Sequence, residues 1–176
     1  MAKSDSFFIR AAVTTSGAND YEQTEIDLGS FVNLGVSKST LLRIHNIAVQ
    51  YVDNSGGPGS PIYHSGATPG GASFQLCTQT QAGLVRATDK SLIASGSLVC
   101  FGNPNSTAYP IGQNETEDLA AQMWRNGYLV GVDSMFLGVN TVALPTSGEL
   151  EVCIVLECTL ENATQASSIA LALSQQ

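Results

Sequence analysis

The clearest pattern in the chain is an alternation of apolar and other residues near its C-terminal end. It runs from Glu149 to Glu161, with one apolar set on the even-numbered positions and several carboxylates on the odd-numbered ones. A period of two places the two sets on opposite faces of a β-strand. The sequence therefore predicts a long strand that is buried on one face and solvated on the other. The residues predicted to face the core are Leu150, Val152, Ile154, Leu156, Cys158 and Leu160.

Further strands are predicted by shorter runs of β-forming residues. In Leu41 to Val52 the apolar parity changes at His45 and Asn46, which predicts a bulge or bend at that point. Tyr128 to Val139 is predicted as one strand with bulges at its glycines. The other predicted strands are Phe7 to Val13, Tyr21 to Leu28, Ser73 to Thr80, Leu84 to Thr88 and Ser91 to Phe101. About seven or eight strands without alternating helices favour an all-β fold, an antiparallel sandwich or barrel.

One short helix is predicted between two late strands. Asn114 is placed to cap it, Glu117 stands in the capping-box position, and Gly127 is placed to end it. Met123 and Trp124 belong to an apolar stripe at helical spacing, so both are predicted to be core anchors.

Two segments fall outside this pattern of strands. Asn54 to Gly71 is rich in Gly and Pro, which predicts a long surface loop. The end of the chain, 162–176, carries no charge and contains Ile169, Leu171 and Leu173. We expect residues 1–161 to form the sandwich domain and residues 162–176 an uncharged arm, which either packs as a short helix or reaches a neighbouring subunit.

Charge is scarce and mostly negative. Charged residues make up 12% of the 176 residues, hydrophobic residues 43%, and the net charge is −8. A surface with few charges lacks the repulsion that keeps molecules apart, which suits a protein covered by neighbouring copies; a monomer with a neutral surface is the alternative. The 7 basic residues are scattered, so direct binding of nucleic acid is not expected.

The chemistry of an active site is not indicated anywhere in the chain. His45 and His64 are the only histidines, and neither stands in a catalytic or metal-binding motif; His45 is interpreted as a hydrogen-bonded strand residue. The four cysteines lack CxxC spacing, and Cys153 and Cys158 have opposite parity on one strand, so buried free thiols are expected. No catalytic residue, cofactor or metal site is predicted, and the protein is not expected to be an enzyme.

The N-terminal residues give no targeting signal. No apolar stretch of signal-peptide length precedes Arg10, and no window approaches ~20 consecutive apolar residues. We therefore expect no secretion by a signal peptide and no transmembrane segment. Synthesis in a cytoplasm, including that of an infected host, is the corresponding expectation.

Taken together, these features resemble the single jelly-roll capsid proteins of icosahedral viruses. The resemblance rests on architecture rather than on a motif: about eight strands, a helix near Asn114 to Arg125, a long last strand and an uncharged terminal arm. It implies a single jelly roll and a virion protein that assembles with copies of itself and with other virion proteins. The first 37 residues hold only Lys3 and Arg10, so another protein or an internal membrane layer would separate such a subunit from the genome, or it would decorate the outside.

The alternative function is a ligand-binding β-sandwich of the carbohydrate-binding type. Such modules present exposed aromatic residues, and the single Trp of this chain is predicted to lie inside. Tyr51, Tyr63 and Tyr109 lie in or beside predicted loops and keep this alternative open.

Overall fold

The structure is a computed structural model, and it describes residues 5–15, 19–34, 38–53, 70–100, 113–142 and 149–175. These residues form nine strands, one turn of 3-10 helix and one α-helix. In chain order they are β1 (Phe7–Thr15), β2 (Tyr21–Asp27), β3 (Lys38–Asp53), β4 (Gly70–Cys77), β5 (Leu92–Cys100), β6 (Gln113–Leu119), η1 (Ala121–Met123), β7 (Tyr128–Val130), β8 (Ser134–Val142), β9 (Leu150–Thr164) and α1 (Gln165–Ser174).

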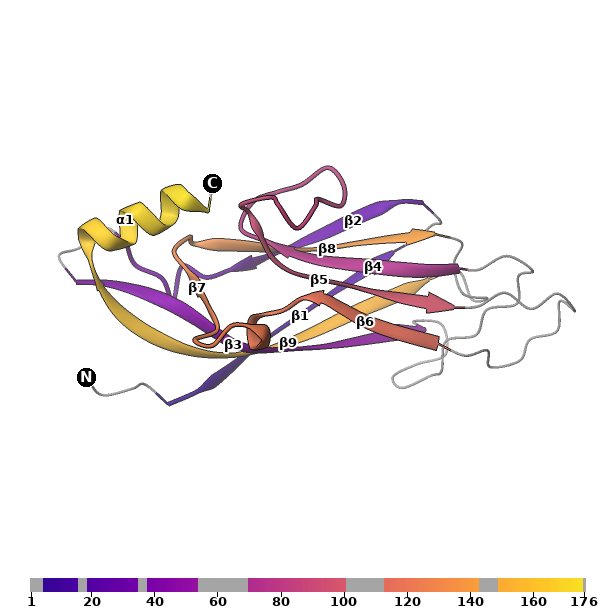
Figure 1. The fold of residues 1–176 in the computed structure, drawn as a ribbon, viewed down its shortest axis with the longest axis horizontal. Coiled ribbons are helices and arrows are strands. Elements are labelled where there is room, and N and C mark those ends of the chain that lie inside the picture. Colours follow the sequence, from indigo (N-terminus) through magenta and orange to yellow (C-terminus); the bar gives the residue numbers. More distant parts are fainter. Residues whose placement is uncertain are drawn as a thin grey trace, which may run out of the picture.

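The strands form two antiparallel sheets that pack face to face. One sheet has the order β1-β9-β3-β7 and the other the order β2-β8-β4-β5-β6. Figure 1 shows the two layers as an elongated sandwich, with α1 at one end. The ends of β3, β5 and β8 that lead into residues 54–69, 101–112 and 143–148 gather at the opposite end.

The pairing of strands is that of a jelly roll. Without β6, the first strand pairs with the last, the second with the last but one, and so on inward: β1 with β9, β2 with β8, β3 with β7 and β4 with β5. This nested order is an antiparallel hairpin wrapped into two sheets, the arrangement expected from the resemblance. The additional strand β6 lies beside β5 at the edge of its sheet.

The core lies between the two sheets and is built from strands of both. Leu156 and Ile154 of β9 and Leu137 and Met135 of β8 belong to one continuous cluster of buried side chains. Five of the six predicted core residues of the long strand are buried, and the sixth, Leu160, is partly buried against the cluster. The predicted face of this strand is therefore confirmed.

The predicted bulge is confirmed as well. The register between β3 and β9 shifts between Ile44 and Asn46, at the residues where the apolar parity changes. His45 occupies the bulge, and its Nε2 lies 2.8 Å from Thr159 Oγ1, as expected for a hydrogen-bonded strand residue. The bulge lets both halves of this strand direct apolar side chains into the core.

The predicted helix at Asn114 to Gly127 is wrong. Residues 113–119 form β6, which pairs with β5 from Cys100 to Ser95, and only η1 follows before β7. The local capping signal is overridden because the segment completes the edge of a sheet. Met123 and Trp124 are exposed rather than core anchors, while Ala120 and Ala121 are buried.

Two predicted strands also differ from the structure. The predicted strand from Tyr128 to Val139 is two strands, β7 and β8, which belong to different sheets because the chain crosses between the layers at 131–133. Leu84 to Thr88 forms no strand, since it lies in the irregular connection between β4 and β5. Of the predicted loop Asn54 to Gly71, residues 54–69, including His64, lie outside the described residues, and Gly70 and Gly71 belong to β4 instead.

Candidate functional site

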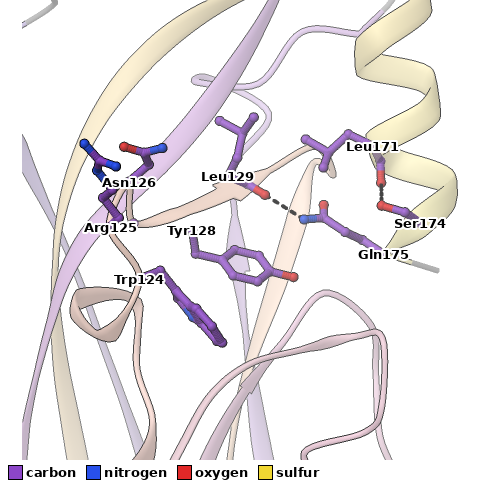
Figure 2. A pocket seen from close by; sticks show the side chains of 9 residues that line it. Trp124, Arg125, Asn126, Tyr128, Leu129, Leu171, Ser174 and Gln175 are labelled. Carbon is purple, nitrogen blue, oxygen red and sulfur yellow. Dashed lines mark hydrogen bonds between the residues drawn. The ribbon is translucent and has the colours of Figure 1, made fainter.

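An open cavity lies between α1 and the segment that leads into β7. It measures about 540 Å³ and is lined on one side by Trp124, Arg125 and Tyr128 and on the other by Leu171 and Gln175. Figure 2 shows the aromatic rings and the helix residues around this hollow. Its lining is largely apolar.

Trp124, which the sequence predicted to be a core anchor, lies at the surface. Its side chain is 52% exposed beside the cavity, and the adjacent Met123 is exposed too. The chain turns at Gly127, whose φ of +66° is a conformation that glycine adopts without strain, and then enters β7. This turn holds the indole at the surface instead of delivering it to the core.

The helix α1 is docked on the same body by polar contacts. Thr164 caps it, with its side chain accepting a hydrogen bond from the Ser167 amide. In its first half, the buried Ser168 hydroxyl donates to Ser39 Oγ at 2.9 Å. The uncharged C-terminal segment therefore contains a short helix packed on its own domain, one of the two arrangements left open by the sequence. The strand β9 continues past Glu161 to Thr164 before this helix begins.

Gln175, just after α1, anchors the end of the described chain. Its Nε2 donates to the Leu129 carbonyl at 2.6 Å, and its Oε1 accepts from the Gly131 amide at 2.9 Å. Its own carbonyl accepts a hydrogen bond from Thr78 Oγ1 at 2.5 Å. The residue is only 4% exposed, so these contacts form inside the protein. Burial raises the pKa of the neighbouring Tyr128 phenol, while a hydrogen bond with Gln175 opposes that shift.

A second, more polar hollow lies on the other side of Arg125. It measures about 350 Å³ and is lined by Arg43, His45, Arg125, Asn126 and Glu161. Arg43 forms a two-pronged ion pair with Glu161, and Arg43 Nη1 also donates to the Asn126 carbonyl at 2.6 Å. The hydrogen bond to Glu161 raises the pKa of the guanidinium. The Arg43 guanidinium already has these hydrogen-bond partners. We therefore assign it a structural role, in which it joins β3, β9 and the turn before β7.

The side chains with reactive chemistry are held apart or buried. The four cysteines are free thiols, as expected, and three of them are buried. Burial raises the pKa of Cys77 to about 11 and of Cys158 to about 12, so both thiols stay protonated near neutral pH. Within the described ranges, no three of the His, Cys, Asp and Glu side chains come together to hold a metal ion. In the same ranges, no helix is long and apolar enough to cross a bilayer.

The outer strands of the two sheets differ in how they are protected from pairing with another chain. Both edges of the five-stranded sheet carry carboxylates. On β2 these are Glu22, Glu25 and Asp27, and on β6 they include Glu117 and Asp118, all of them exposed. Exposed charges on an edge strand oppose the addition of a further strand, because pairing would bring them against a neighbour.

The β7 side of the four-stranded sheet is closed by side-chain amides. The Gln175 carboxamide binds the Leu129 carbonyl and the Gly131 amide, the two kinds of group that an added strand would engage. The Gln122 carboxamide does the same to one residue of β3, since its Oε1 accepts from the Ile47 amide at 3.1 Å and its Nε2 donates to the Ile47 carbonyl at 3.2 Å. Sequence reasoning missed both glutamines because they act on residues far away along the chain.

Comparisons with known proteins support the fold and leave the family open. No protein-family model matches the sequence, and no curated protein matches it. Among solved structures, VP1 of New Jersey polyomavirus aligns with 91% of this chain and 100% of its own at a TM-score of 0.50 and 10% identity. VP1 of human polyomavirus 12, solved with 3'-sialyllactosamine, gives a TM-score of 0.46, 9% identity and coverage of 91% and 100%. The structure of the Merkel cell polyomavirus virus-like particle aligns with 93% of this chain and 75% of its own at a TM-score of 0.38 and 10% identity.

These similar structures are viral capsid proteins with a jelly-roll fold. At 10% identity the likeness concerns the fold alone. The resemblance to jelly-roll capsid proteins is thus confirmed at the level of architecture, in agreement with the nested strand pairing.

Proposed function

We propose that this protein is a structural subunit of a viral capsid or coat, and that it works by assembling rather than by catalysis. The observation that carries the proposal is the complete jelly roll, shared over 91% of the chain with a viral VP1. Only 12% of the residues are charged, which is consistent with a surface covered by neighbouring copies.

The charge distribution makes nucleic acid an unfavourable partner for such a subunit. With 15 acidic and 7 basic residues, the protein is poorly suited to bind phosphates, so its contacts are with copies of itself and with other virion proteins. Another protein or an internal membrane layer would then lie between this subunit and the genome. Its location would be the virion, after synthesis in the host cytoplasm.

Assembly can be tested with the purified full-length chain. We expect sedimentation velocity to show species much heavier than the 18.4 kDa monomer, and negative-stain microscopy to show regular particles or sheets. Because few charges lie at the surface, the assembled fraction should change little as salt is raised. A monodisperse monomer over a wide range of concentration, pH and salt would contradict the proposal.

The exposed Trp124 supports a second candidate function, carbohydrate binding in the 540 Å³ cavity. An indole that faces a hollow, with Tyr128, Arg125 and Asn126 around it, offers a stacking surface and polar groups for a sugar ring. A buried Trp would have opposed this function, whereas Trp124 is exposed in the structure.

Intrinsic fluorescence tests the cavity directly, because Trp124 is the only tryptophan of the chain. If the cavity binds sugars, titration with lactose, N-acetylglucosamine or sialic acid should shift or quench its emission with saturation. Arg125→Ala should weaken that response, whereas Gln23→Ala, on an edge strand of the other sheet, should leave it unchanged. Unchanged emission with all three sugars at millimolar concentrations would exclude them as ligands of this cavity.

A further inference from the structure

One outer strand lacks both kinds of protection found on the others. Among the described strands, β1 is the end strand of its sheet and pairs only with β9, without a register shift from Phe7 to Thr15. One row of its backbone N–H and C=O groups therefore faces away from the sheet along nine residues. In the described part of the chain, no backbone hydrogen bond outside the sheets involves β1.

The side chains of β1 do not discourage a further strand. The strand contains no carboxylate, glycine or proline, and its only charge is Arg10. The guanidinium of Arg10 lies 5.7 Å from the centre of the Phe8 ring, and Phe8 is itself 54% exposed. A long, regular and apolar edge of this kind is an association site, because its open backbone groups and apolar surface are both better satisfied by a neighbouring strand.

We propose that β1 pairs edge to edge with β1 of a second copy of this chain, in an antiparallel arrangement around a two-fold axis. This inference rests on the proposed function, because it names one contact of the assembly. Two identical edges that pair in this way close on each other and leave no further open strand. The strand also carries no acidic residue that would favour a basic partner, whereas the exposed carboxylates on the β2 and β6 edges would repel the same edges of a second copy.

The register follows from parity and overlap. A continuous core face requires that residues facing the core lie opposite residues facing the core, so the numbers of opposed residues must sum to an even value. Pairing centred on Ala11 overlaps all nine residues and places Ile9 opposite Val13. It places Phe8 opposite Thr14 and Arg10 opposite Ala12, which keeps the two Arg10 side chains from lying directly opposite each other. A register centred on Arg10 would oppose them and is disfavoured.

Disulfide trapping tests this register. In the full-length chain with Cys153→Ser, the pair Phe8→Cys and Thr14→Cys should give a cross-linked dimer on mild oxidation, because directly opposed Cα atoms lie ~4.5–5.5 Å apart. The pair Phe8→Cys and Ala12→Cys has no opposed partner in this register and is the matched control. Equal cross-linking in both proteins, or none in either, would overturn the inference. Cys77, Cys100 and Cys158 are buried and can remain in both.

Charge substitutions test the same contact without cross-links. Ala12→Lys would place a lysine opposite Arg10 of the second copy at two places in the symmetric dimer, and this repulsion should raise the dimer dissociation constant roughly tenfold. Ala12→Glu would place a carboxylate there and should leave the dissociation constant unchanged or lower it. Gln23→Lys, on the protected β2 edge, controls for net charge and should have little effect. Equal effects of Ala12→Lys and Ala12→Glu, with melting temperatures unchanged, would overturn the register.

The two proposals fail in distinguishable ways. If dimers are trapped but nothing larger forms, the β1 contact holds and the capsid or coat function fails. If large assemblies form and Phe8→Cys with Thr14→Cys never cross-links within them, the assembly function holds and the β1 contact is wrong.

Discussion

Replacing Leu156 by aspartate is expected to abolish the folded state. Leu156 is fully buried in β9, which pairs with β1 on one side and with β3 on the other. The change would lose roughly 1.5–3 kcal/mol of apolar burial and place a charge in the core at a cost of several kcal/mol more. Together these approach the ~5–15 kcal/mol by which a typical domain is stable.

The measurement is the yield of soluble protein together with its circular dichroism and thermal melting. Ala48→Asp is the matched control, because Ala48 lies exposed on the neighbouring strand β3. The control should be soluble and melt near the parent protein. A Leu156→Asp protein that folds and melts at the parent temperature would contradict the assignment of this face to the core.

A single methyl group at Gly127 is expected to destabilise the protein strongly. Gly127 has a φ of +66°, where an L-residue costs ~1–2 kcal/mol. An added Cβ would also overlap the Ile44 carbonyl oxygen and crowd His45, at the bulge of β3. Because these are backbone atoms of a central strand, they cannot move aside cheaply. We expect Gly127→Ala to lower stability by about 3 kcal/mol or more, which is roughly 6–12 °C in Tm for a domain of this size.

Gly83→Ala is the matched control for this substitution. A Cβ at Gly83 would meet no atom within 4 Å, so the change should be neutral or slightly stabilising. The comparison is made by differential scanning calorimetry of both variants and the parent. Similar Tm values for the two variants would show that the turn before β7 tolerates a side chain.

The strands were predictable where a local pattern and the final burial agree. β9 keeps period two because its two faces meet different environments along most of its length. The parity change at His45 was readable for the same reason, since an extra residue at a bulge keeps both halves of β3 apolar toward the core.

The helix prediction failed because the local capping signals favoured a helix, whereas pairing with β5 favoured a strand. Asn114 and Glu117 fit a capping box, yet the free edge of β5 offered this segment a row of backbone hydrogen bonds along its length. The polar character that suggested a helix start suits an exposed edge strand equally well. The site was even less predictable: Gln122 and Gln175 act across 75 and 44–46 residues of sequence, so no local pattern reveals them.

The central place of β9 has a consequence for how the protein is made. β1 has no neighbour in its sheet until Leu150 to Cys158 have been synthesised, because β9 is its only partner there. At typical elongation rates of ~5–20 residues per second, β1 would wait roughly 7–30 s with both rows of its backbone groups unpaired in the sheet. Such dominance of contacts between distant residues slows folding. We therefore expect the sandwich to close only once β9 is available, and β1 to be the segment most in need of a chaperone until then.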